Sequence, residues 1–260
     1  MWRVPVRIVR LGYHLLRGIT LSHLPHPPMQ RRRIAQQWLA DLNRVLAVDI
    51  SIHGSPPDPD AAALWLPNHV SWLDIPLLGG MRPAPVFLSK SEVGDWPVVG
   101  RLARAAGTLF MRRGSGADSA RDALAEGLTS GRHVVIFAEG TTSDGADVRR
   151  LHPRLIQPAI DADVPIQPVA LRFTTETGAL DRRAAFIDDD HLVGSLWRVL
   201  RARRLQVAVH FLDPILPGEA AVTRDQIARL AEQRIRHVLK NAASDTSFPA
   251  NPVSSSILRS

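Results

Sequence analysis

The chain of 260 residues contains no cysteine. That absence excludes disulfide bonds, thiolate metal ligands and a cysteine nucleophile. Aromatic residues are scarce as well, at 5% with a single tyrosine, so few side chains could stack on the bases of single-stranded nucleic acid. Lysine is nearly missing, because only Lys90 and Lys240 occur, and the net charge of +7 comes almost wholly from arginine. These absences favour a membrane surface as the anionic partner, and we expect no nucleic-acid binding.

A long hydrophobic run is also absent, because nowhere do about 18 apolar residues follow one another, as a transmembrane helix requires. The N-terminus lacks the compact apolar region and cleavage site of a signal peptide. Residues 1–24 instead alternate basic and apolar side chains at helical spacing: Arg3, Arg7, Arg10, His14 and Arg17 against Val4, Ile8, Leu11, Leu15 and Ile19. This pattern predicts an amphipathic helix in the headgroup region, with its basic face toward anionic lipid and its apolar face in the acyl boundary. The alternative is an ordinary helix packed on the core.

The middle of the sequence indicates one α/β domain. With 45% hydrophobic and 22% charged residues, the chain can bury a single substantial core. Apolar runs alternate with helical patterns, which predicts a mixed sheet covered by helices over residues 30–242. The predicted strands are 63–67, 85–88, 108–111, 133–137, 166–173, 184–187 and 205–211. The predicted helices are 31–46, 98–106, 117–129, 155–162, 191–202 and 223–240. Serine, asparagine and proline accumulate beyond them, so 243–260 is predicted to be a disordered tail.

A histidine and an aspartate follow the first of these strands, in the segment Asn68-His69-Val70-Ser71-Trp72-Leu73-Asp74. Open α/β sheets place catalytic groups at such strand ends. A carboxylate beside a histidine fixes its tautomer and stabilises the imidazolium, which makes the pair a general base. In a continuous helix, positions five apart point roughly 140° away from each other. His69 and Asp74 can therefore meet only if His69 lies before the helix or in its first turn; the alternative is a surface loop.

Two further segments end predicted strands with polar residues. In the segment 137–143, Glu139 and Gly140 suggest a tight turn whose amides and hydroxyls, including those of Thr141 and Thr142, could hold a polar headgroup or phosphate. The alternative is a strand-to-loop turn with glycine for geometry. In the segment 107–113, a strand leads to two arginines, of which Arg113 could bind phosphate oxygens in forked geometry. The alternative is a solvated sheet edge.

In this order, and together with the segment 164–168, these blocks resemble those of the glycerolipid acyltransferases typified by 1-acylglycerol-3-phosphate acyltransferase. The resemblance covers roughly residues 30–240, and its strongest part is an HxxxxD motif from His69 to Asp74. It implies that His69 is the general base for the acceptor hydroxyl and that Asp74 orients it. It also implies that Arg113 contacts phosphate and that Glu139 and Gly140 are binding or structural residues. Pro165 and Pro168, in the fourth block, would shape the site.

Three departures from the family pattern bear on the acceptor. In the third block, Ala138 stands where phosphatidate-forming members commonly have proline, and Thr142 stands where they have arginine. Arg112 replaces an acid in the second block, and His152 aligns with a common lysine. Threonine offers no cationic fork to a phosphomonoester. These changes resemble the pattern of relatives that acylate other lysolipids, lyso-ornithine lipid among them.

The resemblance implies transfer of a fatty acyl group from acyl-CoA or acyl carrier protein to the free hydroxyl of a lysolipid. The expected partners are the bilayer, the lysolipid and the acyl donor, and we expect neither a cofactor nor a metal ion, since no His-Glu-x-x-His pattern occurs. The expected location is peripheral or monotopic, on the cytoplasmic face of the inner membrane. The alternatives are a lipid hydrolase with Ser71 as nucleophile and a non-catalytic membrane adaptor. The hydrolase lacks the Gly-x-Ser-x-Gly elbow.

Overall fold

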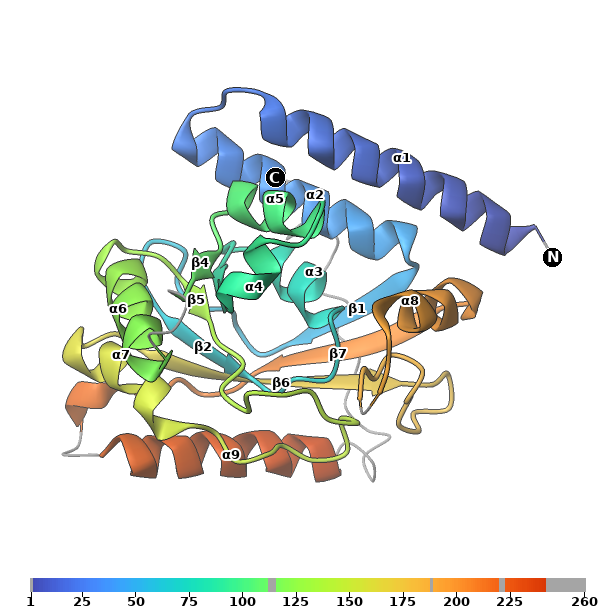
Figure 1. Ribbon diagram of the computed structural model, residues 1–260. Coiled ribbons are helices and arrows are strands. Elements are labelled where there is room, and N and C mark those ends of the chain that lie inside the picture. Colours follow the sequence, from blue (N-terminus) through green and yellow to red (C-terminus); the bar gives the residue numbers. More distant parts are fainter. Residues whose placement is uncertain (1, 112–115, 188, 220–222, 242–260) are drawn as a thin grey trace.

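A seven-stranded sheet forms the centre of the protein in a computed structural model that describes residues 2–111, 116–187, 189–219 and 223–241 (Figure 1). Its strands are β1 Val48–His53, β2 Leu64–Pro67, β3 Val86–Ser89, β4 Leu109–Phe110, β5 Val134–Val135, β6 Ile166–Thr174 and β7 Leu205–Phe211. Their order is β1-β7-β6-β2-β5-β3-β4. Neighbouring strands are parallel except β6 and β7, which are antiparallel. The predicted mixed sheet in one α/β domain is therefore confirmed.

Helices cover both faces of this sheet (Figure 1). One face carries α1 Arg3–His23, α2 Pro28–Val45, α3 Asp74–Gly79 and α8 Leu192–Arg201, with the short helices α4 Ser91–Gly94 and α5 Val99–Ala105 beside them. The other face carries α6 Gly116–Thr129, α7 Gln157–Asp161 and α9 Arg224–Asn241. Alternate strand residues point to opposite faces of the sheet. Trp65 packs into the hydrophobic cluster on the first face, and Leu64 and Leu66 pack into the cluster on the other face. This burial on both faces explains why the central strands read as continuous apolar runs.

One predicted strand was wrong, and one observed strand was not predicted. The segment 184–187 is not a strand; its alanines are buried, but the amide of Phe186 donates to the carbonyl of Val70 at 3.0 Å instead of joining a ladder. An apolar run alone does not distinguish a strand from an irregular buried segment. Conversely, β1 was missed, although its alternation of apolar and polar residues is typical of a half-buried edge strand. The predicted disordered tail lies outside the described residues.

Helix α1 exists, but two members of its predicted basic stripe, Arg7 and His14, contact the domain, whereas Arg3, Arg10 and Arg17 are exposed. The guanidinium of Arg7 donates to the carbonyls of Leu200, Ala202 and Arg203. His14 is buried and stacks on Trp38 with ring centroids 4.6 Å apart. These contacts of Arg7 and His14 with distant residues cannot be predicted from helical spacing alone.

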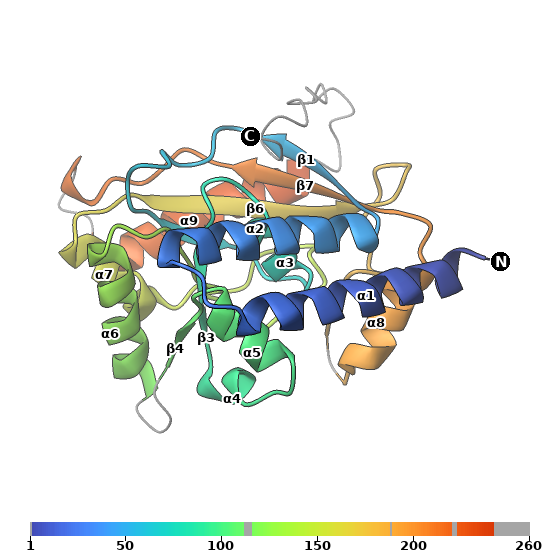
Figure 2. The same ribbon diagram turned by 90° about the horizontal axis from the view of Figure 1, so that it is seen from above.

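The outward side of α1 also carries an apolar strip. Val6, Val9, Tyr13 and Leu16 are all exposed and follow one another at helical spacing. Figure 2 shows α1 beside α2, with α5 and α8 next to α1 on its other side. Among the helices of the described residues, none is long and apolar enough to cross a membrane. An interfacial role for residues 1–24 remains a prediction, now with the apolar side as the candidate contact.

Candidate active site

The site begins where β2 ends. The side chain of Asn68, which is fully buried, donates to the carbonyl of Leu171 at 3.0 Å and accepts from its amide at 2.7 Å. An asparagine side chain presents both a donor and an acceptor, so it can replace a backbone pair at the end of a ladder. The chain is thereby fixed to β6 just before His69. From there it turns away from the sheet toward α3.

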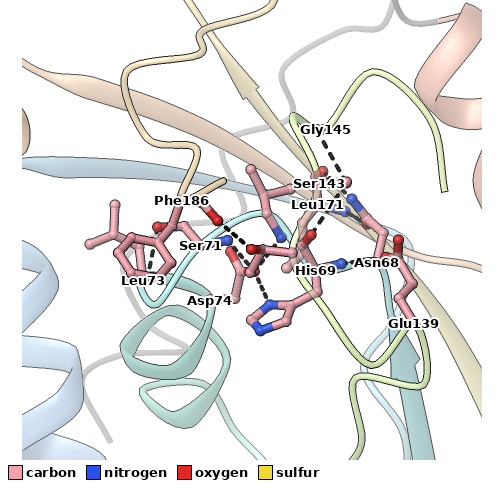
Figure 3. A network of polar contacts seen from close by, with 12 residues as sticks. Asn68, His69, Ser71, Leu73, Asp74, Glu139, Ser143, Gly145, Leu171 and Phe186 are labelled. Carbon is pink, nitrogen blue, oxygen red and sulfur yellow. Dashed lines mark hydrogen bonds and ion pairs between the residues drawn. The ribbon is translucent and has the colours of Figure 1, made fainter. Parts of the chain in front are cut away.

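Asp74, the first residue of α3, organises the loop that precedes it (Figure 3). Its Oδ2 accepts hydrogen bonds from the amides of Val70, at 2.7 Å, and Ser71, at 2.9 Å. The same oxygen lies 2.8 Å from Nδ1 of His69. The loop therefore folds around the carboxylate, and the predicted contact between His69 and Asp74 is present because His69 lies before the helix. Asp74 is completely buried, so water cannot compete for this oxygen.

The imidazole of His69 is held on two sides. Its ring stacks on Phe137, with centroids 3.8 Å apart and an angle of 15° between the ring planes. Its side chain remains 18% exposed. When Nδ1 carries the proton shared with Asp74, Nε2 is left with its lone pair. Within the described residues, no hydrogen bond occupies Nε2, so the geometry suits a general base toward a substrate on the exposed side.

Glu139 fixes the backbone of His69. Its Oε1 accepts from the amide of His69 at 2.6 Å, and its Oε2 accepts from the amide of Arg149 at 2.8 Å. Burial raises the pKa of the Glu139 carboxyl, although the two amides oppose the shift. Both oxygens are thus engaged within the protein, which favours the structural interpretation of Glu139 over a direct contact with the substrate.

The family model described as Acyltransferase matches residues 49–172, which include His69, Asp74 and Glu139. The chain is 43% identical over 244 residues to a lyso-ornithine lipid O-acyltransferase of Pseudomonas aeruginosa, covering 92% of each protein. The chain belongs to the acyltransferase family.

Two other relatives bear on this acyltransferase. A 1-acyl-sn-glycerol-3-phosphate acyltransferase of Neisseria gonorrhoeae is 34% identical over 203 residues, covering 76% of this chain and 78% of that protein. The crystal structure of the 1-acyl-sn-glycerophosphate acyltransferase of Thermotoga maritima superposes with a TM-score of 0.61 at 19% identity, covering 92% of this chain and 90% of that one. At that identity the superposition shows a shared fold, and it agrees with the mixed sheet and its covering helices.

In the turn after β5 of the acyltransferase, the residues predicted to bind a headgroup also maintain the local structure. Gly140 has a φ of +73°, which favours glycine, and a Cβ there would lie 3.3 Å from Nε2 of His152, a tight contact. The hydroxyl of Thr142 donates to the carbonyl of Phe186, and Thr141 is exposed. The structure therefore brings Gly140, Thr141 and Thr142 near the catalytic loop, with the Thr142 hydroxyl already engaged by the protein.

Ser143 is a site residue that the sequence did not single out. Its amide donates to the carbonyl of His69 at 2.8 Å, and its hydroxyl lies 3.3 Å from the same oxygen. The His69 backbone is thus held by Glu139 at its amide and by Ser143 at its carbonyl. In the sequence, only its position at the end of the segment 137–143 pointed to this role.

The remaining predicted residues divide into three groups. Arg113 lies outside the described residues, so its contact with phosphate stays a prediction. Pro165 accepts a hydrogen bond from the amide of Leu64 at 2.9 Å, and Pro168 lies within β6 opposite β2. Ser71 is completely buried, and its hydroxyl accepts from the amide of Leu73 at 3.3 Å. A nucleophile must reach its substrate, so the burial of Ser71 argues against the hydrolase alternative.

Proposed function

We propose that this acyltransferase moves a fatty acyl group from a thioester donor to the free hydroxyl of a lysolipid, with His69 as general base. Nε2 of His69 takes the hydroxyl proton as the acceptor oxygen attacks the thioester carbonyl. The carbon–sulfur bond then breaks, and the imidazolium returns the proton to the leaving thiolate. An ester and a free thiol result, and no acyl-enzyme is needed. The observation that carries the proposal is the 2.8 Å contact between Nδ1 of His69 and Oδ2 of Asp74.

Asp74 contributes in two ways. It holds the tautomer that leaves Nε2 free, and its charge stabilises the imidazolium that forms during the transfer. Backbone amides of Val70 and Ser71 hold the carboxylate in place, so little reorganisation is needed when the ring becomes charged. The burial of Asp74 strengthens this interaction, because fixed charges act over a low local dielectric.

For the acceptor, two candidates follow from the relatives: a 1-acylglycerol-3-phosphate type of lysolipid and lyso-ornithine lipid. The second is favoured by the 43% identical relative that carries this name. It is also favoured by Thr142, whose hydroxyl is engaged by the carbonyl of Phe186 and whose side chain has no charge to offer a phosphomonoester. The donor in this proposal is acyl-CoA or acyl carrier protein, and no cofactor takes part.

The proposed location is the cytoplasmic face of the inner membrane, with peripheral or monotopic attachment. The outward side of α1 supports it, because Val6, Val9, Tyr13 and Leu16 present a continuous apolar strip to solvent. Apolar strips of this kind on a helix with arginines nearby are typical of interfacial helices. A soluble domain gains nothing from exposing such a strip, whereas a bilayer surface can bury it.

The test offers lysophosphatidate and lyso-ornithine lipid side by side to the purified protein with acyl-CoA and, separately, with acyl carrier protein loaded with the same chain. Product masses identify the acceptor. Acylation of lyso-ornithine lipid alone would support the favoured acceptor, and acylation of lysophosphatidate alone would replace it with the phosphatidate-forming reaction. Turnover on neither, with either donor, would contradict the proposal and favour a non-catalytic membrane adaptor.

A further inference from the structure

A basic cavity lies beside the N-terminal end of α1, away from the catalytic loop. Its volume is about 510 Å³, within the range of small-molecule sites. Arginines from two segments line it, two from α1 and two from the residues just before β7, together with three other residues: Arg3, Arg7, Arg203, Arg204, Ala47, Glu176 and Gln206. Nothing in the proposed acyl-transfer step uses these residues.

Two of the four arginines are already engaged within the protein. Arg7 donates to three backbone carbonyls, and its burial and the charge of Arg3 lower its pKa. Arg204 forms an ion pair with Asp49 at 2.8 Å. These contacts fix one wall of the cavity. A fixed guanidinium can bind an anion without first losing side-chain freedom.

The other two arginines carry uncompensated charge. Neither Arg3 nor Arg203 forms an ion pair with an acidic residue of the described part of the chain. The lining contains four arginines and one acidic residue, Glu176, and Asp49 pairs with Arg204, so positive charge is in excess. Clustered guanidinium groups of this kind match the oxygens of a phosphate ester in geometry and charge.

We propose that this cavity binds the phosphate group of an anionic phospholipid of the membrane to which the protein attaches. The inference rests on the proposed membrane attachment through α1. Trp2, next to Arg3 in the chain, is 83% exposed, and Val6 lies one turn further along the outward apolar strip. A helix with side chains is about 10–12 Å across, so residues on its inner side lie at headgroup depth when its outer side is in the acyl boundary. With α1 attached in this way, the arginines of the cavity lie at the depth of the lipid phosphates.

The same chemistry could serve a second source of phosphate ester, the nucleotide part of acyl-CoA. The lipid is favoured because the arginines share α1 with the apolar strip, whereas no contact joins the cavity to His69 among the described residues. The experiment therefore includes both ligands.

The test compares two double variants of the whole chain. Arg3→Gln with Arg203→Gln removes the two unpaired guanidinium groups of the cavity. Arg10→Gln with Arg201→Gln removes the same charge from α1 and from the end of α8, at exposed positions outside the lining. Each protein is titrated with phosphatidylcholine vesicles with and without phosphatidylglycerol, and with a soluble short-chain phosphatidylglycerol. The KM for acyl-CoA is measured on the same preparations.

The control pair should lose only general attraction to the anionic surface, about fivefold for each arginine. The cavity pair should lose at least about tenfold more, and it alone should lose binding of the soluble lipid. Equal losses in the two pairs would overturn the proposal. So would a raised KM for acyl-CoA in the cavity pair with lipid binding equal to the control, because the cavity would then serve the donor. Wild-type turnover is read independently, so a failure of the acyl-transfer proposal would appear as no product and would leave the lipid comparison intact.

Discussion

Replacing Asp74 with asparagine tests how the carboxylate supports His69, the proposed general base. The substitution keeps the size of the side chain, and its amide oxygen can still accept from the amides of Val70 and Ser71. Its amide nitrogen, however, would occupy the place of Oδ1, which is buried and has no hydrogen-bond partner in the structure. A buried donor left without an acceptor costs about 1–3 kcal/mol of folding stability. We therefore expect a modest fall in the free energy of unfolding.

The effect of Asp74→Asn on turnover should be larger. A neutral amide no longer stabilises the imidazolium, and hydrogen bonds to charged groups exceed neutral ones by about 1–2 kcal/mol, or roughly fivefold to thirtyfold. If the amide nitrogen turns toward His69, the ring must carry its proton on Nε2 and cannot act as a base. With the loss of the correct tautomer included, the expected fall in kcat is about a hundredfold to ten-thousandfold. Because binding of the ground state is untouched, KM should change little.

The assay follows thiol release from acyl-CoA with the preferred lysolipid, with product confirmed by mass. Asp144→Asn is the matched control, since it makes the same chemical change at a partly exposed aspartate whose ion pair with Arg182 spans 2.9 Å. That control should keep kcat within about twofold of wild type, as expected for a surface ion pair. A folded Asp74→Asn protein with wild-type kcat would refute the assigned role of Asp74.

Three further predictions concern other parts of the molecule. In Glu139→Gln, the side-chain N–H would face a backbone N–H that the carboxylate now accepts from. We expect kcat to fall roughly tenfold or more in steady-state assays. An unchanged kcat would rule out positioning by Glu139. The pKa of His210 is lowered from 6.5 to about 4 by burial first, and then by a neighbouring histidine and arginine. Its native state therefore binds fewer protons, and stability present above pH 6.5 is lost as the pH falls toward 4. Urea unfolding should show a loss of about 2 kcal/mol from this group between pH 7 and pH 5, so His210→Gln should reduce the total loss, and an equal loss in wild type and variant would contradict this cause. Val9→Gln with Tyr13→Gln should weaken binding to vesicles about tenfold or more, whereas Leu216→Gln, an exposed leucine near α9, should not; equal binding by both would contradict membrane contact through α1.

The sequence predicted much of the fold because its strongest signals are local. The apolar runs that became β6 and β7 lie in the core, and the helical pattern of 223–240 became α9 almost unchanged. The contact between His69 and Asp74 was also predictable, since their spacing allows it only when the histidine precedes the helix. Each of these inferences needs information from a few neighbouring residues.

The features that were missed depend on contacts between distant parts of the chain. Contacts with Trp38 and with the carbonyls near the end of α8 determine which side of α1 faces the domain. Helical spacing does not reveal these contacts. The role of Glu139 became clear only from the two amides that it holds, one 70 residues earlier in the chain. The segment 184–187 crosses the catalytic loop because the amide of Phe186 pairs with Val70, a partner that no local pattern specifies.

The central claim is that Nε2 of His69 removes the proton of the acceptor hydroxyl. The most direct measurement is kcat for acyl transfer by wild type and by His69→Ala at saturating lysolipid, with circular dichroism confirming that both proteins are folded. General-base catalysis predicts a fall of about a hundredfold to ten-thousandfold in the variant. Wild-type turnover by folded His69→Ala protein would contradict the mechanism.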